Sequence, residues 1–196
     1  AEVRIRLPTW MDLEVFGREW EGEVRNSHGT VTLRNLEGDL VLRDLRGDVE
    51  AHSSEGTIEA AELSGNARLR TGNDDLRVAS SSASLQLETV DGDILLAHLD
   101  SPRVRVRTTD GDVEFSGRLR SQGDYTFSSH GGDISLHLAE PVNVDARILA
   151  YEGEFESDFR VQATGYRSGE ALEFSLGGGG AALNVETYDG EIRLLR

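Results

Sequence analysis

The sequence predicts an all-β protein, a β-solenoid (β-helix) of short strands that turn at Gly and Asp corners. Three regularities lead to this prediction. A Gly, or a residue such as Asp, Ala or Ser, recurs every nine residues along most of the chain. Apolar residues stand two and four positions after it, with polar residues between them. A Ser or Thr recurs about every 18 residues. A repeat of this kind is the signature of a solenoid.

The nine-residue period defines the strands. The corner positions are Gly29, Gly38, Gly47, Gly56, Gly65, Asp74, Ala83, Gly92 and Ser101, then Gly111 after a one-residue insertion. Alternation such as Val31-Thr32-Leu33 after each corner is typical of a strand with one buried face. Gly every nine residues would cost about 1 kcal/mol each inside a helix, so we expect almost no helix.

The longer period sets the size of one coil. Ser53, Thr71, Thr89 and Thr108 are 18 or 19 residues apart, which favours a coil of about 18 residues with two strands. Residues 18 apart then become neighbours, which places Glu50 beside Arg68. The same coil stacks Asp75, Asp93 and Asp112, which repel each other. A 27-residue coil with three strands avoids this acidic column but scrambles the Ser and Thr positions.

The pattern divides the chain into four parts of a single domain, residues 1–196. Residues 1–26 contain Val3, Ile5, Leu7 and both Trp residues and are expected to cap one end. Residues 27–138 are the regular nine-residue half-coils, and residues 139–180 are longer, irregular strands that widen the C-terminal end. These include a turn at 167–170. Residues 181–196 restore the motif as the final coil.

Composition excludes several functions. The chain has 36 acidic and 20 basic residues, a net charge of −16, and every basic residue is Arg. This charge argues against a nucleic-acid partner, because such binding depends on cationic side chains. No apolar run approaches the ~18 residues of a membrane-spanning helix. The absence of Cys excludes disulfides and thiol chemistry.

The sequence resembles a known bacterial group. The units Thr89-Val90-Asp91-Gly92-Asp93-Ile94 and Thr108-Thr109-Asp110-Gly111-Asp112-Val113, together with the opening VRIRLP and the closing GGGGAALNVETYDGEIRLLR, are similar to the putative-adhesin family of β-solenoids, a group of unknown function. The resemblance covers essentially the whole chain. It implies an envelope-associated or exported protein and supplies no catalytic residues.

Acidic residues beside the corners are the first candidate site. A row of carboxylates could hold calcium, which prefers oxygen ligands, and a calcium-binding β-roll also has a nine-residue repeat. The alternative, which we favour, is that Asp at a turn accepts hydrogen bonds from nearby backbone amides. No cofactor is therefore expected, and calcium stays a weak alternative. The calcium candidates are Asp91, Asp93, Asp110, Asp112 and Asp133.

Catalytic arrangements have less support. The pairs Asp91/Asp93 and Asp110/Asp112 could cleave a glycosidic bond if they lay about 5–9 Å apart on successive coils. Nothing distinguishes them from the other turn acids, and aromatic residues are too few, at 6%, for an obvious sugar-stacking platform. The five His residues show no metal-binding spacing, and the run Gly177–Gly180 lacks the Lys of a phosphate loop. We expect no enzyme.

A basic stripe is the remaining candidate. Arg103, Arg105 and Arg107 alternate on one strand and should all point outward, where they could bind an anionic glycan or an acidic partner. We therefore expect a non-catalytic, adhesin-like module of the bacterial envelope or surface, serving adhesion, spacing or self-assembly. Its partners would be a surface glycan or protein, or a second copy through the ends or edges of the solenoid. The alternative is a β-helix that binds or cleaves polysaccharide.

Overall fold

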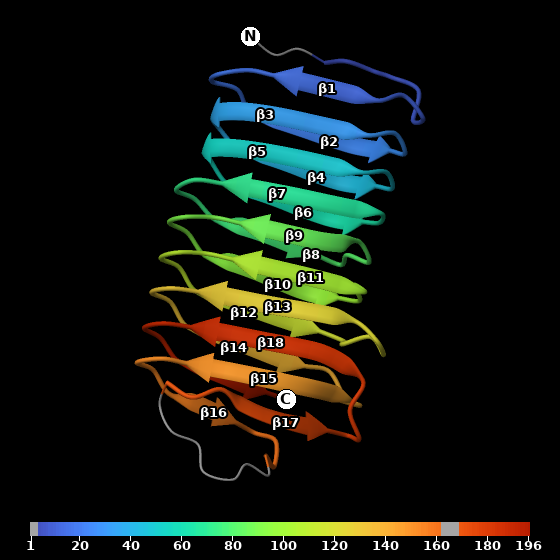
Figure 1. Cartoon of the computed structure of the whole chain (residues 1–196). Helices are drawn as coiled ribbons and strands as arrows, with labels where there is room; N and C mark the ends of the chain where they lie inside the picture. Colours follow the sequence, from blue (N-terminus) through green and yellow to red (C-terminus); the bar gives the residue numbers. More distant parts are fainter. Residues whose placement is uncertain (1–3, 162–168) are drawn as a thin grey trace.

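The protein is a rod of stacked coils with one β-sheet on each side (Figure 1). The computed structural model describes residues 4–161 and 169–196. Every regular element in these two ranges is a strand. The described residues accordingly contain no helix that could cross a membrane. The predicted all-β solenoid is confirmed.

Strands with odd numbers up to β17, together with β18, form a ten-stranded sheet, here called sheet A. In spatial order its strands are β1 (Leu13–Phe16), β3 (Val31–Glu37), β5 (Val49–Glu55), β7 (Asn66–Thr71), β9 (Ser84–Glu88), β11 (Arg103–Arg107), β13 (Asp124–Ser129), β18 (Ala181–Thr187), β15 (Val144–Ala150) and β17 (Leu172–Leu176).

The opposite side of the rod is a nine-stranded sheet, sheet B. In spatial order its strands are β16 (Phe155–Ser157), β19 (Ile192–Leu195), β14 (Ile134–Leu138), β12 (Val113–Gly117), β10 (Ile94–Leu99), β8 (Leu76–Ala79), β6 (Ile58–Leu63), β4 (Leu40–Leu45) and β2 (Gly22–Ser27).

Each regular coil has 18 residues and two strands. Val31 pairs with Val49 in sheet A, and Leu40 pairs with Ile58 in sheet B, both in parallel register. The 18-residue coil is thus confirmed, and the 27-residue alternative is wrong. Glu50 does lie beside Arg68, as the 18-residue spacing predicts.

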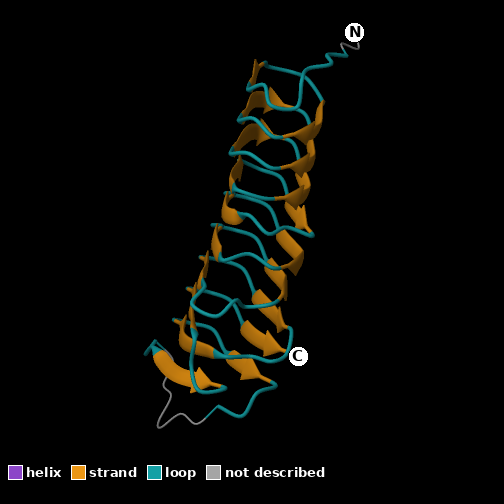
Figure 2. Ribbon diagram, turned by 90° about the vertical axis from the view of Figure 1, so that its right-hand side faces the viewer, coloured by secondary structure: helices purple, strands orange, loops and turns teal. Residues whose placement is uncertain are grey.

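The core runs along the inside of the rod between the two sheets (Figure 2). Inward residues such as Leu33, Leu42, Leu69 and Leu87 are fully buried, while the residues between them face solvent. Because every strand contributes only one face, the hydrophobic layer is thin and depends on close stacking of neighbouring coils.

A column of left-handed residues bends sheet B once per coil. The residues are 18 apart, have φ between 49° and 58°, and lie near the ends of their strands or just after one: Asn26, Asp44, Glu62, Ser80 and His98. The bend breaks the strict alternation, so that the next residue, for example Leu45 or Leu63, also points inward and is buried. In the sequence these residues appear only as a position that recurs every 18 residues and differs from the Ser or Thr position of the other half-coil. Their backbone conformation is not evident from it.

Replacing one of these residues with Gly should stabilise the rod. An L-residue in this conformation costs about 1–2 kcal/mol, which Gly avoids. We expect Glu62→Gly to raise the free energy of unfolding by up to about 1 kcal/mol, since Gly also loses more chain entropy on folding. Glu114→Gly, at an exposed extended position in β12, is the control and should lower it by roughly 0.5–1 kcal/mol. Urea denaturation compares the two, and a Glu62→Gly that destabilises as much as its control would contradict the prediction.

Buried hydroxyl groups tie the corners of successive coils together. Thr71 Oγ1 donates to Gly56 O at 3.1 Å, and Thr187 Oγ1 donates to Gly132 O at 3.1 Å. Ser53 and Ser129 make the same type of bond to a Gly carbonyl in the neighbouring coil. These contacts explain most of the 18-residue Ser and Thr period, because a hydroxyl can satisfy a carbonyl that the turn leaves unpaired. Thr108 is the exception, since its buried Oγ1 has no hydrogen-bond partner among the described residues.

Order in space differs from order along the chain at the C-terminal end. Strand β18 lies between β13 and β15, and β19 lies between β14 and β16. The final coil, residues 181–195, is therefore inserted inside the rod, and the segment that precedes it in the sequence forms the outer end. Figure 1 shows this inversion as the red strand β18 above the orange β15.

The two ends of the rod are built differently. At the C-terminal end, β17 pairs antiparallel with β15, the one antiparallel pair among the described strands. At the N-terminal end, residues from Thr9 to Phe16 form the first partial coil, with Leu13 N donating to Thr30 O at 2.8 Å. Val3 of the expected cap and residues 167–168 of the expected turn lie outside the described residues.

Candidate binding face and aspartate column

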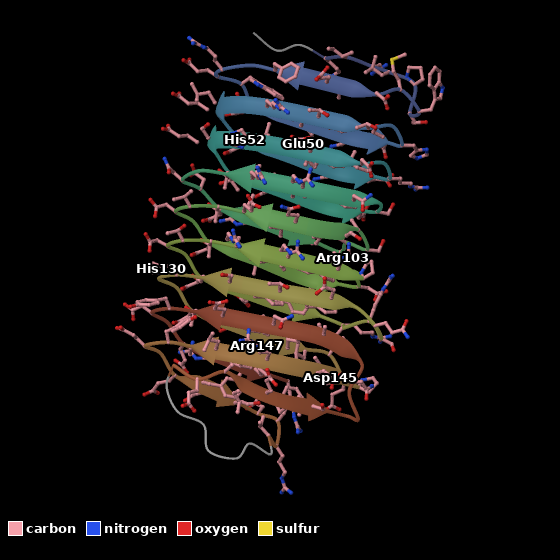
Figure 3. All side chains as sticks on the ribbon, viewed as in Figure 1. Glu50, His52, Arg103, His130, Asp145 and Arg147 are labelled. Atoms are coloured by element: carbon pink, nitrogen blue, oxygen red, sulfur yellow. The ribbon has the colours of Figure 1, made fainter. Side chains whose placement is uncertain are left out.

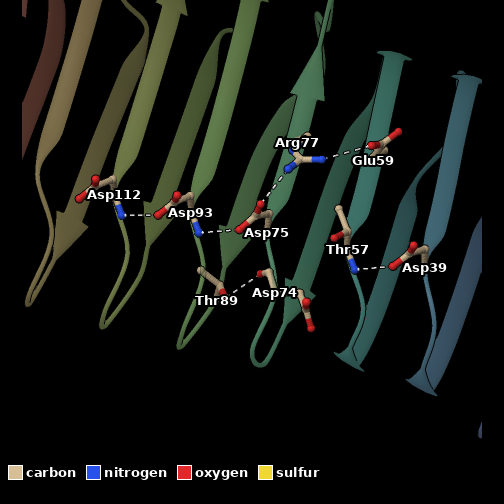
Figure 4. Close-up of polar contacts among 9 residues, drawn as sticks. All are labelled: Asp39, Thr57, Glu59, Asp74, Asp75, Arg77, Thr89, Asp93 and Asp112. Atoms are coloured by element: carbon tan, nitrogen blue, oxygen red, sulfur yellow. Dashed lines mark hydrogen bonds and ion pairs between the residues drawn. The ribbon is translucent and has the colours of Figure 1, made fainter.

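The aspartates beside the Gly corners form a hydrogen-bonded column that runs across sheet B coils (Figure 4). Asp75 Oδ1 accepts from Asp93 N at 3.1 Å, and Asp93 Oδ1 accepts from Asp112 N at 2.9 Å. Asp112 Oδ1 in turn accepts from Asp133 N, and Asp133 Oδ1 accepts from Glu191 N, both at 2.8 Å. Each carboxylate therefore satisfies a backbone amide of the next coil.

This column explains how the 18-residue coil tolerates stacked acids. A carboxylate that accepts a backbone N–H is stabilised by that dipole, which offsets repulsion from its neighbours. One carboxylate oxygen of each of Asp93, Asp112 and Asp133 already accepts a backbone N–H. No group of three or more His, Cys, Asp or Glu residues in the described ranges is arranged to hold a metal ion. The geometry favours the backbone-capping interpretation of Asp93, Asp112 and Asp133 over a calcium row.

A chelator test separates the two interpretations. We expect EDTA to leave the melting temperature unchanged, because the column needs no ion. Asp112→Ala should lower it by roughly 2–4 °C, since Asp133 N loses its acceptor. Asp91→Ala is the matched control, because the Asp91 carboxylate has no hydrogen bond among the described residues, and it should change little. A fall in melting temperature with EDTA, reversed by calcium, would contradict the prediction.

The two other acidic candidates lie together without converging on a pocket. Asp91 and Asp110 are in register on adjacent coils, joined by an isolated β-bridge. They lie at the same corner as the column, as the residue before each Gly. The His residues are dispersed: His52 lies on sheet A and His130 lies at a corner (Figure 3).

The arginine stripe lies on the outer face of sheet A, as predicted from alternation. Arg103 is 3.7 Å from Asp124 on β13. Arg105 faces Gln86 on one side and Thr126 on the other.

Arg107, like Arg105, has no acidic side chain bound to it among the described residues. It lies beside Glu88, but that carboxylate binds Arg70 at 3.0 Å. Within the described ranges, Arg105 and Arg107 therefore have no acidic hydrogen-bond partner, so two guanidinium groups face solvent on an acidic rod.

A shallow groove crosses the same face. It has a volume of about 540 Å³ and extends over β3, β5, β7, β9 and β11. Its charged lining changes sign along its length, with Asp48 and Glu50 towards one end and Arg103 and Arg105 at the other. Figure 3 shows Glu50 and Arg103 on the viewer's side of this sheet. A groove of this shape, open and polar, suits an extended polar chain better than a compact small molecule.

Arg120, which lies beyond the stripe, has a structural role. Arg120 makes two hydrogen bonds to Asp100, at 2.9 and 3.0 Å, and these hold the pKa of that carboxyl below its usual value. Arg120 N also donates to the hydroxyl of Tyr125, which donates to Ser101 O at 2.7 Å. Burial raises the pKa of Tyr125. These contacts fix the corner that precedes β13.

Sequence reasoning missed a stack of rings at the Gly corner of the C-terminal end. The rings of His130 and Tyr188 are 4.9 Å apart and nearly parallel, and Tyr151 follows at 5.7 Å. Tyr188 donates to Glu152, and that carboxylate raises the pKa of Tyr188. The residues occupy the same corner position in three coils, but the insertion of the last coil makes them neighbours. Tyr188 lies between the other two rings, and both tyrosines remain exposed, Tyr151 at 41% and Tyr188 at 43%.

Comparison with known proteins identifies the family of the chain but assigns no functional site. The sequence profile of the family described as Toastrack DUF4097 matches residues 21–195. The chain belongs to the Toastrack DUF4097 family. This match confirms the resemblance to a β-solenoid group of unknown function. The Toastrack match leaves out residues 1–20 and the last residue, Arg196.

Other comparisons add little to the Toastrack assignment. No curated protein matches the chain. A solved structure, described as a putative cell adhesion protein from Clostridium sporogenes, is 14% identical with a TM-score of 0.33. The alignment covers 75% of this Toastrack chain and 55% of that protein, so the chain spans about half the length of the structure it matches.

Proposed function

We propose that this protein is a non-catalytic, rod-shaped module of the bacterial cell envelope or cell surface, acting in adhesion, spacing or self-assembly. The observation that carries the proposal is the groove on sheet A with Arg105 and Arg107 beside it. Arg105 and Arg107 are two residues apart on β11, about 7 Å along the strand, and the neighbouring coils extend the same rigid face, so a partner is recognised over an extended surface.

The chemistry of this face favours an extended anionic glycan as the adhesive partner. Unpaired guanidinium groups bind carboxylate or sulfate groups through paired hydrogen bonds. Against a net charge of −16, these local cations also orient an anionic chain towards one part of the rod. Neutral groups in the groove, such as Asn66 and Gln86, supply hydrogen bonds to sugar hydroxyls.

A glycan array tests the proposal. The wild-type protein should bind acidic glycans, with affinity that falls as salt increases. Replacing Arg105 and Arg107 together with Gln should weaken this binding about tenfold, the loss expected from two exposed charge contacts. Arg147→Gln is the matched control: it is also outward on sheet A, but Arg147 already lies 3.6 Å from Glu173. Equal losses in both variants, or no glycan bound by the wild type, would contradict the proposal.

Polysaccharide cleavage is the alternative function. The register of Asp91 with Asp110 is the observation in its favour, because two adjacent carboxylates are the minimum for glycoside hydrolysis. A reducing-sugar assay on the glycans that bind distinguishes the alternatives. We expect no new reducing ends, and their appearance, lost in Asp110→Asn, would replace the non-catalytic proposal.

A further inference from the structure

Among the described residues, the N-terminal end of the rod exposes large apolar side chains, whereas most of those at the C-terminal end are covered. Several large apolar side chains are exposed at the N-terminal end, including Trp10 at 73% and Phe16 at 59%. At the other end, β17 folds back against β15, and Phe155 packs near Phe174 with ring centroids 6.1 Å apart. The ring of Phe159 is covered by Arg196. Unsatisfied apolar surface is thus concentrated at one end.

An opening of about 410 Å³ leads into the core at this N-terminal end. Its lining combines apolar residues, among them Ile5, Leu7 and Val24, with polar ones such as Glu23 and Arg25, so residues 5–8 lie beside β2. Solenoid ends normally carry a cap that covers the last coil, because an exposed core and an unpaired strand edge both favour association. Trp10 and Phe16 alone leave on the order of 250 Å² of exposed aromatic surface here.

Strand β2 is the edge of sheet B beside this opening. Among the described strands, it pairs with β4 alone. Gly22 N donates to Asp39 O on the β4 side, at 2.9 Å. Because backbone groups alternate in direction along a parallel strand, those of Glu23 and Arg25 face the free edge. Their side chains lie on the outer face of the sheet, about half exposed, and bind each other.

The order of charges on β2 selects one way of pairing. In a two-fold contact, the edge strand of one copy pairs antiparallel with the same strand of the second copy, and one residue of that strand lies on the symmetry axis. With Glu23 or Arg25 on the axis, like charges stand opposite each other, which is destabilising. With Val24 on the axis, Glu23 of each copy stands opposite Arg25 of the other copy. This register also joins the backbone groups that face the edge.

We propose that β2 is a self-recognition edge, which pairs antiparallel with β2 of a second copy about an axis through Val24. The inference deepens the self-assembly part of the proposed function and rests on it. Sheet B then continues from one rod into the next, and the two openings face each other once residues 5–8 move out of the space beside β2. Because a two-fold contact closes on itself, association through this edge stops at a head-to-head dimer.

Charge exchange tests this pairing with the 196-residue chain. In sedimentation equilibrium, the wild type should form a dimer as concentration rises. Glu23→Arg and Arg25→Glu should each dimerise at least about tenfold more weakly, because attraction becomes repulsion at two sites. An equimolar mixture of the two variants should form a heterodimer with affinity near that of the wild type, since opposite charges again face each other. Both variants should keep the wild-type circular dichroism spectrum.

A cross-link provides the second measurement. Residues on the axis form a non-hydrogen-bonded pair, whose Cα atoms lie about 4.5 Å apart, within disulfide range. The chain has no Cys, so Val24→Cys introduces a single thiol and should give a covalent dimer under mild oxidation. Leu36→Cys, an exposed position in sheet A, is the control and should stay monomeric.

Each outcome decides the pairing separately from the adhesive role. A wild type that is monomeric at all concentrations, or single variants that dimerise as well as the wild type, would overturn the proposed edge. A mixture that fails to restore the dimer would overturn the register. Glycan binding by a monomeric protein would leave the adhesive role standing, and a dimer without glycan binding would leave the edge standing.

Discussion

Gly132→Ala should destabilise the rod severely. A Cβ built on Gly132 would overlap the carbonyl oxygen of Gly111 in the neighbouring coil, and Gly190 approaches Gly132 in the same manner. These corner glycines form a column in which each backbone lies directly against the next. Relief requires the coils to separate, and separation breaks the Thr187 hydrogen bond to Gly132 O and the sheet pairing on both sides. We expect a loss of about 3 kcal/mol or more in the free energy of unfolding.

The adjacent glycine provides a matched control for this experiment. A Cβ on Gly131 would meet the side chain of Asp110, which can rotate away, and the nearest backbone atom is Thr109 O at 3.6 Å. Gly131→Ala should therefore cost less than about 1 kcal/mol, in the range of ordinary surface substitutions. Thermal and urea unfolding followed by circular dichroism compare the two variants. Similar losses in both would mean that the corner column does not control coil spacing.

Leu183→Ala should loosen two sets of coils at once. Leu183 is fully buried on β18, which lies between β13 and β15. Truncating a buried Leu leaves a cavity and typically costs about 2–5 kcal/mol. Because stability in a solenoid is shared between neighbouring coils, the damage should spread in both directions from the inserted coil.

Hydrogen exchange locates this effect. Amides of β13 and of β15 should both lose protection in Leu183→Ala, whereas those of β4 should not. Leu42→Ala is the control, because Leu42 is equally buried on β4 in the regular part of the rod. It should reduce protection in β2 and β6 and leave β15 unchanged. If Leu183→Ala affects β15 but leaves β13 fully protected, the last coil would not lie inside the rod.

Local chemistry explains why so much of the fold is predictable. The Gly corner, the alternating strand and the Ser or Thr hydroxyl are each specified by one or two residues and repeat at fixed spacing. Residues 18 apart, such as Leu40 and Ile58, therefore become neighbours without any long-range information. The acidic column was predicted as a contact but not as a stable one, because the sequence does not show that Asp112 accepts from the backbone of the next coil.

The candidate binding face was predictable only in part. Alternation places Arg103, Arg105 and Arg107 outward, and the structure agrees. Which of these cations is neutralised depends on the strands on either side, since Asp124 lies 3.7 Å from Arg103 while Glu88 is bound by Arg70.

The sequence alone therefore determines the coil, its period and its inward face, because these follow from contacts within one repeat and between adjacent repeats. Tertiary structure decides the order of the last coils, the stacking of Tyr188 between His130 and Tyr151, and the difference in apolar exposure between the two ends. The physical reason is that any regular coil could pair with any other. Only packing of the whole C-terminal segment, including the antiparallel β17, selects where residues 181–195 enter the stack.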